Sequence, residues 1–351
     1  MLLSIVIINY NTFELTCNCI HSIAQTASIE YEIILVDNNS RECAATDFLK
    51  IFPNLHLVEL KENVGFGRAN NYGVAKAIGK YVLLLNSDTL VHEHTIDDTV
   101  SYLIAHSEID ILGCKVMTNG GAIQRTVYEY KGELSFFRSV IFFIKRNSVM
   151  KALIAIVYKQ LQKRSQKKTA RETVALHEEP QKKEALKLTP NYQNGKRIGA
   201  LVGVFLLLKK SVYQESKGFD PDFFMYDEEL NWFLKRLRSY NIVYYPDASI
   251  FHFFGKSDVY RKMSLQQRVS QYLFWYKMSI PHFMLFILYN LLEIPSKAIM
   301  SLVTLKKEYI AEVPFIFRAF PYALFDIPRY SNKYGGRKHM LKLRSLKKAG
   351  L

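Results

Sequence analysis

The chain opens on an apolar, β-branched run at positions 2–9, with the sequence Leu2-Leu3-Ser4-Ile5-Val6-Ile7-Ile8-Asn9. A run without polar alternation fits a strand that is buried on both faces, as in parallel sheets covered by helices. The run leads directly into the polar turn Asn9-Tyr10-Asn11. We therefore expect a central parallel strand that presents polar side chains at its carboxyl end.

Strands and helices alternate along the next hundred residues. Helical spacing over residues 14–25 is followed by a strand over 31–36, a helix near 43–52 and a strand over 55–60. The glycine-containing stretch 63–73 runs into a helix that ends near 78, and residues 80–85 form another buried strand. This order predicts an α/β fold with a mostly parallel sheet and helices on both faces.

Polar clusters follow three of these predicted strands, at residues 9–11, 37–39 and 86–88. Ligands of such sheets bind beyond the carboxyl ends of the strands, so three clusters at equivalent ends indicate a site. The carboxylate of Asp37 can accept hydrogen bonds from a base or ribose. Asp88 can hold a hard divalent cation against a diphosphate. Each cluster alone would also fit an ordinary turn or helix cap.

A further acidic cluster closes the stretch Gly218-Phe219-Asp220-Pro221-Asp222-Phe223-Phe224-Met225-Tyr226-Asp227-Glu228-Glu229, where a turn leads into a predicted helix. The helix macrodipole favours three adjacent acids at its N-terminus and keeps them ionised. An ionised carboxylate that faces a pocket can act as a general base on a sugar hydroxyl. Simple capping of a surface helix would use the same residues, but the surrounding aromatic residues favour a partly buried cleft.

His252 lies among aromatic residues after a predicted strand over 242–245. A lone histidine in such surroundings is usually a core residue. It would become a metal or diphosphate ligand only if its segment folded back onto Asp88.

Charge is distributed unevenly along the chain. The net charge is +15, which favours an anionic partner. Residues 136–144 and 149–161 are apolar with interspersed cations, which fits amphipathic helix, and residues 163–187 are highly charged without aromatics. The latter composition is typical of a flexible insertion.

The C-terminal third is apolar but interrupted by charges and prolines. Within residues 272–305, the longest stretch without a charge is the 15-residue segment 278–292, whereas a spanning helix needs about 20 residues. We therefore favour helices that lie in a membrane interface; the alternative is a pair of helices packed on the catalytic core. The tail 329–351 carries eight Lys and Arg and no acid, which suits an anionic lipid surface.

Two functional classes, nucleic-acid-binding proteins and nucleotidyltransferases, fit the sequence poorly. A nucleic-acid-binding protein would interleave basic and aromatic residues on one face, whereas the cations here gather in the insertion and tail, so we expect no nucleic acid partner. A nucleotidyltransferase would need a glycine-rich, basic loop after the first strand, where this chain has Asn9-Tyr10-Asn11-Thr12. The four cysteines have neither zinc-site spacing nor a clear disulfide pattern, and no secretory signal is visible, so we expect reduced thiols and a cytoplasmic location.

Taken in order, these segments resemble family 2 glycosyltransferases of the GT-A fold, and most closely the bacterial rhamnosyltransferase-like enzymes of surface polysaccharide synthesis. The resemblance covers residues 2–120 and about 198–260. It rests on the segments at 4–11, 36–40, 63–71, 85–89, 199–205 and 218–229, together with His252 and Ser257.

The resemblance implies a role for each matching residue. The nucleotide-sugar site would comprise Asn9, Asn11, Asp37, Asn39, Gly65, Arg68, Asn70, Asn86, Ser87 and Asp88, with Asp37 recognising the nucleoside. Asp88 and His252 would bind a divalent metal, Mg²⁺ or Mn²⁺. Glu229 would be the catalytic base, with Glu228 or Asp227 as alternatives.

The chain departs from the family pattern at two positions. Asn86 stands where the metal motif usually has its first acid, and Glu229 stands where the base is usually Asp. Both departures leave open a degenerate GT-A fold that only binds. The implied reaction is otherwise an inverting single displacement, unlike the two-step route of retaining glycosidases.

The resemblance implies transfer of a sugar, with rhamnose as one candidate, from a nucleotide-diphosphate sugar to a glycan or lipid-linked glycan acceptor. We expect residues 1–120 to bind the donor, 121–197 to be a basic insertion, 198–262 to hold the acceptor and catalytic half, and 263–351 to form helices and a tail associated with the inner face of the plasma membrane. The sequence leaves the oligomeric state open.

Overall fold

The computed structural model describes residues 1–118, 121–129, 136–147, 149–150, 152, 198–253, 260–305, 308–311 and 313–327. It divides into two compact units, which we call the sheet unit and the helical unit. The sheet unit comprises residues 1–131, 191–274 and 329–351, and the helical unit comprises 132–190 and 275–328. Each unit is described by itself.

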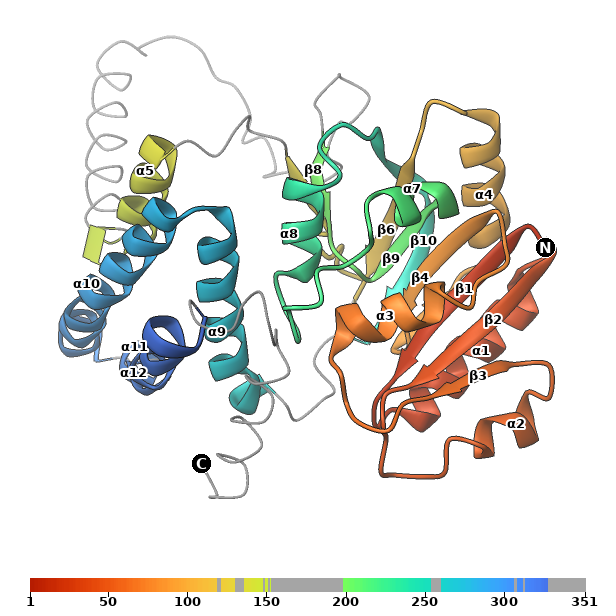
Figure 1. The fold of residues 1–351 in the computed structure, drawn as a ribbon, viewed down its shortest axis with the longest axis horizontal. Helices are drawn as coiled ribbons and strands as arrows, with labels where there is room; N and C mark the ends of the chain where they lie inside the picture. Colours follow the sequence, from red (N-terminus) through yellow and green to blue (C-terminus); the bar gives the residue numbers. More distant parts are fainter. Residues whose placement is uncertain are drawn as a thin grey trace, which may run out of the picture. The chain divides into compact units, whose positions relative to one another are not determined.

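The sheet unit is built on an eight-stranded mixed sheet in the order β3-β2-β1-β4-β9-β6-β10-β5 (Figure 1). The strands are β1 (Leu3–Asn9), β2 (Tyr31–Asp37), β3 (His56–Glu59), β4 (Tyr81–Asn86), β5 (Thr89–Val91), β6 (Ile111–Met117), β9 (Phe205–Lys209) and β10 (Ile242–His252). Strands β3, β2, β1 and β4 are parallel neighbours, whereas β9 runs antiparallel to β4 and β6, and β5 runs antiparallel to β10. The predicted α/β class with a mostly parallel sheet is confirmed.

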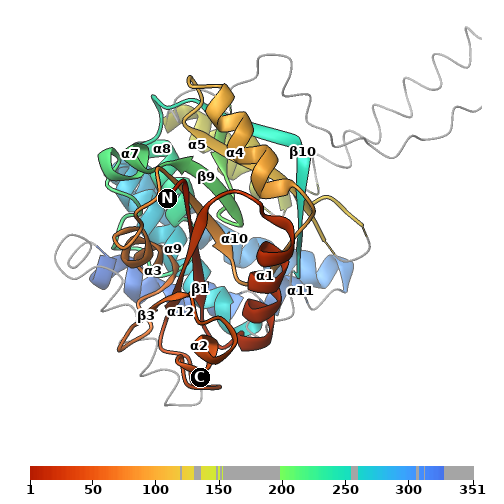
Figure 2. The same ribbon diagram turned by 90° about the vertical axis from the view of Figure 1, so that its right-hand side faces the viewer.

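Helices cover both faces of this sheet. They are α1 (Phe13–Thr26), α2 (Asp47–Ile51), α3 (Phe66–Val74), α4 (Thr95–Ala105), α7 (Lys210–Glu215) and α8 (Glu228–Lys235). Figure 2 shows α1 and α3 on opposite sides of β1. The predicted helices near 43–52 and through 78 are shorter in the structure, where they cover Asp47–Ile51 and Phe66–Val74.

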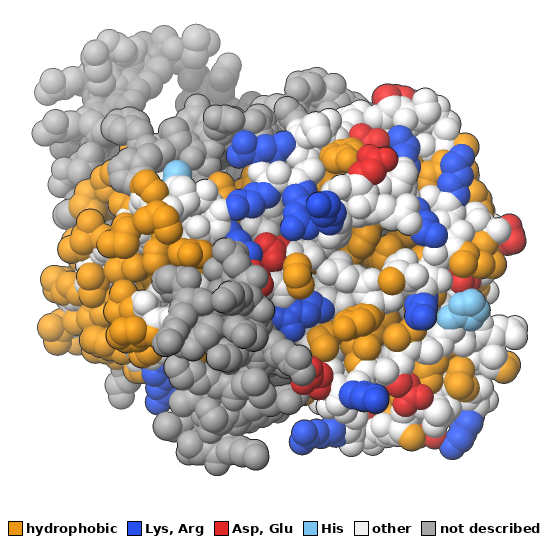
Figure 3. Space-filling view, viewed as in Figure 1, with side chains coloured by type: hydrophobic (Ala, Val, Ile, Leu, Met, Phe, Trp, Pro, Cys, Tyr) orange, Lys and Arg blue, Asp and Glu red, His pale blue; other side chains and the backbone are white. Residues whose placement is uncertain are grey.

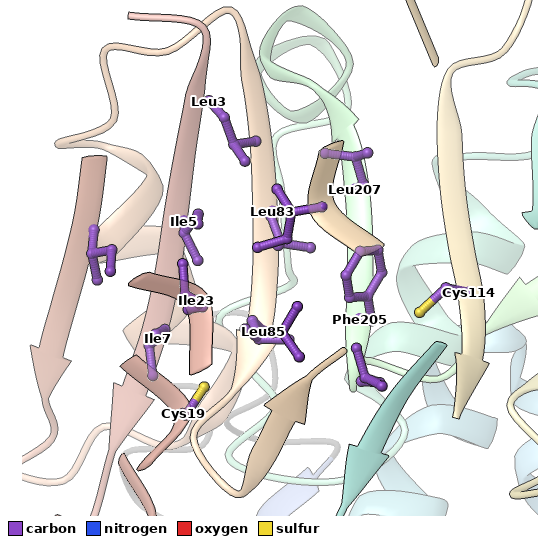
Figure 4. Close-up of a cluster of buried hydrophobic side chains, with 14 of the residues drawn as sticks. Leu3, Ile5, Ile7, Cys19, Ile23, Leu83, Leu85, Cys114, Phe205 and Leu207 are labelled. Atoms are coloured by element: carbon purple, nitrogen blue, oxygen red, sulfur yellow. The ribbon is translucent and has the colours of Figure 1, made fainter. Parts of the chain in front are cut away.

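Alternate side chains of the buried strands supply two separate cores. Leu3, Ile5 and Ile7 of β1 pack on one face with Ile23 of α1 (Figure 4), whereas Val6 packs on the other face with α3 and α8. Because both faces are covered, β1 and β4 have no solvent-facing row, and their sequences are continuously apolar as expected for central parallel strands.

Residues 199–208 are an apolar run that would fit one strand, but the structure divides them. The run forms β8 (Ile198–Leu201) and then β9, which belong to different sheets, because the chain turns at Val202–Val204. Strand β8 pairs instead with β7 (Val127–Glu129). Strand β10 is also longer than predicted and continues to His252, so this histidine lies at a strand end rather than in a loop.

The helical unit contains α5 (Phe136–Arg146), α10 (Ile280–Thr304), α11 (Glu308–Ala311), α12 (Val313–Pro321) and the π-helix η2 (Tyr322–Asp326). Helix α9 (Tyr260–Met278) begins in the sheet unit and ends in this one. Phe143 of α5 packs between the rings of Trp275 and Tyr289, at centroid distances of 5.0 and 4.9 Å. The predicted helix over 136–144 is confirmed; most of segment 149–161, the insertion 163–187 and the tail 329–351 lie outside the described residues.

Gly73 of α3 makes the close approach between this helix and strands β1 and β2. A Cβ atom there would lie 2.4 Å from Cγ1 of Val6 and 3.1 Å from Cγ2 of Val36. We predict that Gly73→Ala lowers the free energy of unfolding by about 1–3 kcal/mol, because the core must move to admit the methyl group. Chemical denaturation measures this. Tyr72→Ala, on the exposed face of the same helix, is the control with little expected effect; an equally small effect of Gly73→Ala would contradict the packing.

Candidate functional site

The site begins where β1 and β2 end side by side. In the parallel register Asn9 is paired with Asp37, and the Asn9 amide Nδ2 donates to Asp37 Oδ1 at 2.8 Å. Both side chains are buried, at 0% and 5% exposure. The second carboxylate oxygen of Asp37 accepts the backbone N–H of Ser40 at 3.0 Å. Asp37 is thus a fixed, hydrogen-bonded acceptor at the carboxyl edge of the sheet, as a base- or ribose-binding residue would be.

The two turns that follow these strands are joined to one another. Asn11 Oδ1 accepts the backbone N–H of Arg41 at 2.8 Å, and the backbone N–H of Asn11 donates to Ser40 Oγ at 3.1 Å. Asn11 and Asn39 both have positive φ, 54° and 63°, a conformation that Asn tolerates better than most residues. These two predicted residues therefore shape the turns that follow Asn9 and Asp37.

The glycine-containing stretch approaches the acidic turn rather than standing apart from it. Gly65 has φ 88°, and a Cβ there would lie 2.0 Å from the carbonyl oxygen of Phe224. The backbone N–H of Phe66 donates to that same oxygen at 2.9 Å, and Arg68 Nε donates to the carbonyl of Pro221. Only glycine fits at position 65, and the stretch is thereby tied to the turn that carries the acids.

Asn70 is buried, and its amide donates to the carbonyl of Phe66 one turn earlier in α3 at 3.0 Å. Asn38 and Asn63, two polar residues of this region, were missed by sequence reasoning. Asn38 accepts the backbone N–H of Val64 and donates to Asn63 Oδ1, both at 2.9 Å, which joins the second strand end to the glycine stretch. A signal was present, since Asn38 sits inside the cluster 37–39.

The third cluster brings Asp88 and His252 together. Strand β5 pairs with β10 so that Thr89 lies opposite His252, and Asp88 Oδ1 is 3.2 Å from His252 Nε2. The condition set for the histidine, that its segment fold back on Asp88, is therefore met. The neighbouring Ser87 hydroxyl is 3.2 Å from that of Thr12, which joins this cluster to the first strand end.

Gln124 orients the histidine and was missed by sequence reasoning. Its Oε1 lies 2.8 Å from His252 Nδ1. When Nδ1–H donates to this oxygen, the Nε2 atom faces Asp88, which is the arrangement of a metal-binding imidazole held by an outer partner. Nothing in the local sequence around Gln124 signals this role.

These residues fit a divalent cation that is shared with a ligand. Asp88 Oδ1 and His252 Nε2 lie 3.2 Å from each other. The side-chain oxygen Oδ1 of Asn86, two residues before Asp88, is buried without a hydrogen-bond partner among the described residues. No group of three His, Cys, Asp or Glu side chains that could by itself hold a metal ion is present in the described part of the chain. A bound diphosphate would have to complete the coordination, as is usual for Mg²⁺.

The acidic turn is strained and buried. Tyr226 and Asp227 both have positive φ, 71° and 63°, a conformation that is uncommon for residues other than glycine. Glu228 is 2% exposed, and its Oε2 has no hydrogen-bond partner among the described residues. Burial, and then the neighbouring Glu229, raise the pKa of Glu228 well above its ordinary value.

Glu229 is held by the loop between β8 and β9. Its Oε1 accepts the backbone N–H of Gly203 at 3.2 Å, and a Cβ at Gly203 would lie 2.6 Å from that oxygen. Burial raises the pKa of Glu229 as well. Burial, and then the charges of Asp227 and Glu229, raise the pKa of the Tyr128 hydroxyl in β7. This indicates that Tyr128 lies near these acids. Gly203 and Tyr128 are further residues that sequence reasoning missed.

The chain matches a family of known proteins over part of its length. Residues 4–165, just under half of the chain, match the family described as "Glycosyl transferase family 2". The predicted resemblance to family 2 glycosyltransferases of the GT-A fold is therefore confirmed.

Two curated relatives each match about a third of the chain. The minor teichoic acid biosynthesis protein GgaB of Bacillus subtilis (strain 168) is 31% identical over 119 residues, 32% of this chain and 13% of that protein. The putative teichuronic acid biosynthesis glycosyltransferase TuaG of the same organism is 27% identical over 125 residues, 34% of this chain and 49% of that protein. The chain thus spans less than half the length of these relatives.

Two solved structures share the fold. The mannosyltransferase PcManGT from Pyrobaculum calidifontis, in complex with GDP-Man and Mn²⁺, has a TM-score of 0.52 at 15% identity, over 92% of this chain and 87% of that one. Staphylococcus aureus TarS 1–349, in complex with UDP-GlcNAc, has a TM-score of 0.50 at 14% identity, over 92% and 82%. At these identities the likeness concerns the fold.

The raised pKa of Glu228 has a consequence for stability. A carboxyl whose pKa is higher in the folded than in the unfolded chain contributes fully below the unfolded pKa, and this contribution is lost as the pH rises through the folded value. We predict that Glu228→Gln raises Tm near pH 7 by roughly 2–4 °C for each kcal/mol gained, and that the gain disappears near about pH 4.

Thermal unfolding at the two pH values measures this effect. Glu93→Gln, an exposed glutamate of the same unit, is the control with no pH-dependent gain. A Glu228→Gln variant that is less stable than the wild type near neutral pH would contradict the burial of an unfavourable charge.

Proposed function

We propose that the chain is an inverting glycosyltransferase that moves a sugar from a nucleotide-diphosphate sugar to a hydroxyl of a glycan or lipid-linked glycan acceptor. The observation that carries the proposal is a set of polar groups in the sheet unit. Asp37 is a fixed, hydrogen-bonded carboxylate, Asp88 lies 3.2 Å from His252, and burial raises the pKa of both Glu228 and Glu229.

The donor side is assigned to the carboxyl ends of β1, β2 and β4. Asp37 would accept hydrogen bonds from the nucleoside, with Asn9 holding the carboxylate and with Asn11 and Asn39 forming the rim. Gly65, Arg68 and Asn70 belong to the stretch beside it, and Asn86 and Ser87 adjoin the diphosphate. Support comes from the fold neighbours, whose structures contain GDP-Man and UDP-GlcNAc; rhamnose remains one candidate sugar.

A divalent cation, Mg²⁺ or Mn²⁺, belongs to the proposal. Asp88 and His252 would hold it, with Gln124 fixing the imidazole. Such a cation supplies neutralisation of the charge that develops on a leaving diphosphate. The complex of PcManGT with Mn²⁺ is consistent with this assignment.

Glu229 is proposed as the base. One of its oxygens is fixed by the N–H of Gly203, and the other takes the proton of the acceptor hydroxyl. The acceptor oxygen then forms its bond to the anomeric carbon while the bond from that carbon to the diphosphate oxygen breaks. A raised pKa places the base nearer to neutrality, where proton transfer is more effective. Glu228 and Asp227 remain the alternatives within the same turn.

The biological setting is proposed from the relatives. GgaB and TuaG are named for teichoic and teichuronic acid biosynthesis, which supports a role in bacterial cell-surface polysaccharide synthesis. Residues 1–120 would form the donor half, 198–262 the acceptor half, and 121–197 a basic insertion. Residues 263–351 would give a peripheral position at the cytoplasmic face of the plasma membrane.

A degenerate fold that binds without catalysis is the competing function, because Asn86 and Glu229 replace the usual acids. The two are separated by one assay, in which the purified chain, a nucleotide sugar and an acceptor extract are tested for release of nucleoside diphosphate. Release that depends on acceptor supports the enzyme, and nucleotide binding without any release supports the binding protein.

For the base, we predict that Glu229→Gln lowers kcat by about 10²–10⁴-fold while donor binding stays unchanged, because the amide cannot take a proton. Nucleoside diphosphate release gives kcat, and calorimetry gives the Kd of the donor. Glu93→Gln is the matched control with unchanged activity. Turnover of Glu229→Gln near the wild-type level would show that another group is the base.

For the cation, we predict that His252→Ala raises the half-saturating concentration of Mn²⁺ by roughly tenfold or more, and that Gln124→Leu does so to a smaller extent. Titration of nucleotide binding with Mn²⁺ measures both. His106→Ala, which removes an exposed histidine of the same unit, is the control. An unchanged Mn²⁺ requirement in both site variants would remove His252 from the cation site.

A further inference from the structure

Helix α10 of the helical unit exposes apolar side chains and buries its charged ones, which is the reverse of a helix that faces water. Each exposed residue along its length is apolar: Ile280, Pro281, Met284, Leu288, Leu291, Leu292, Pro295, Ile299, Leu302 and Val303. We call these ten residues the outer face of α10. A surface helix of a water-soluble domain carries polar residues on this side.

The charged and amide side chains of α10 point the other way. Glu293 and Lys297 are 2% and 8% exposed, and they pair with each other at 3.5 Å. Asn147, just after α5, donates to Glu293 Oε2 and to Ser296 Oγ, both at 2.9 Å. The helix therefore satisfies its polar groups inside the unit and leaves only hydrocarbon outside.

The outer face is part of a wider apolar surface. Phe142 and Ile144 of α5 and Phe317 of α12 are also exposed, and so are Leu324 and Phe325 of η2. Most of the exposed large hydrophobic side chains of the described residues lie in the helical unit, although it is the smaller one. Figure 3 shows hydrophobic side chains gathered over the helical unit. Contiguous apolar patches of this kind mark an interaction site.

Cations border this surface and indicate what covers it. Lys145 and Arg146 close α5 and are exposed, and the Arg146 guanidinium lies 5.7 Å from the centre of the Phe142 ring. Basic heads at the edge of an apolar face are typical of side chains that reach from hydrocarbon to anionic headgroups. A protein partner would not require basic residues at the border of an apolar, largely aliphatic face.

The position of these cations also decides how the helix lies. Helix α10 has 25 residues and is the one described helix that is long and apolar enough to cross a membrane, on length and composition alone. Asn147 contacts α10 at Glu293 and Ser296, near the middle of the helix, and the exposed Arg146 is next to it. If α10 spanned a bilayer, this arginine would lie near the bilayer centre, where charge is costly.

We propose that the helical unit docks on a lipid bilayer with anionic headgroups, with the outer face of α10 immersed in the plane of the interface. This deepens the peripheral position that forms part of the proposed function. It does not require sugar transfer, so the two can fail separately.

The test is flotation of the full chain with phosphatidylcholine vesicles, with and without phosphatidylglycerol. We expect the wild type to float with anionic vesicles. We expect Leu288→Glu/Leu292→Glu to lose partitioning by roughly a hundredfold, because two leucines no longer leave water. The matched control is Ile78→Glu/Ile104→Glu, which changes exposed isoleucines of the sheet unit and should float like the wild type. Wild type that stays out of the vesicle fraction would overturn the proposal.

Four further measurements separate membrane docking from the alternatives. Leu288→Gln/Leu292→Gln should also fail to float, which guards against misfolding of the acidic variant, and Tm should match the wild type for both. Sedimentation velocity without vesicles tests whether a second copy of the chain covers the outer face instead. If the wild type is an oligomer, the double variant is a monomer and the wild type does not float, the outer face contacts a second copy and the proposal is wrong. Alkaline carbonate should release the wild type from vesicles; retention would indicate a spanning helix and would contradict the in-plane position. Sugar transfer is measured separately, as the release of nucleoside diphosphate by the double variant in the presence of a soluble acceptor.

Discussion

The candidate site depends on the parallel register that places the ends of β1, β2 and β4 side by side. Because Asn9 is paired with Asp37 in that register, one amide can hold one carboxylate at 2.8 Å inside the core edge. A slip of one residue would turn every side chain to the opposite face, so the register is fixed by contacts particular to one face, such as the close approach of Gly73 to Val6 and Val36. The polar ends are therefore positioned by the hydrophobic core.

The acidic turn shows the opposite balance. Two consecutive residues with positive φ, Tyr226 and Asp227, lead into Glu228 and Glu229, whose pKa values are both raised by burial. These features cost stability and are maintained by the surrounding contacts, such as the N–H of Gly203 and the approach of Gly65 to Phe224. Natural proteins accept local strain of this kind at functional sites. The concentration of strain, burial and like charge in one turn is the reason to assign it the chemistry.

Much of the first 120 residues could be predicted, because buried parallel strands and amphipathic helices leave strong patterns in sequence. Asp88 and His252 were brought together only by the family resemblance, because their contact depends on β5 pairing antiparallel with β10, a strand far along the chain. Gly203 and Gln124 act through a backbone N–H and a single amide, which leave no pattern. The break within residues 199–208 was missed because the run is uniformly apolar. For α10 the sequence showed the apolar content, but the inward direction of Glu293 and Lys297 required the structure.

The central claim is that Asp37 and Asp88 belong to one nucleotide site completed by a cation. Calorimetric titration of the chain with UDP, GDP and dTDP, each with and without Mn²⁺, tests it most directly. The account predicts that at least one nucleotide binds, that Mn²⁺ strengthens this binding, and that Asp37→Ala and Asp88→Ala each weaken it. Absence of binding by all three nucleotides, or binding that is indifferent to both substitutions, would contradict it.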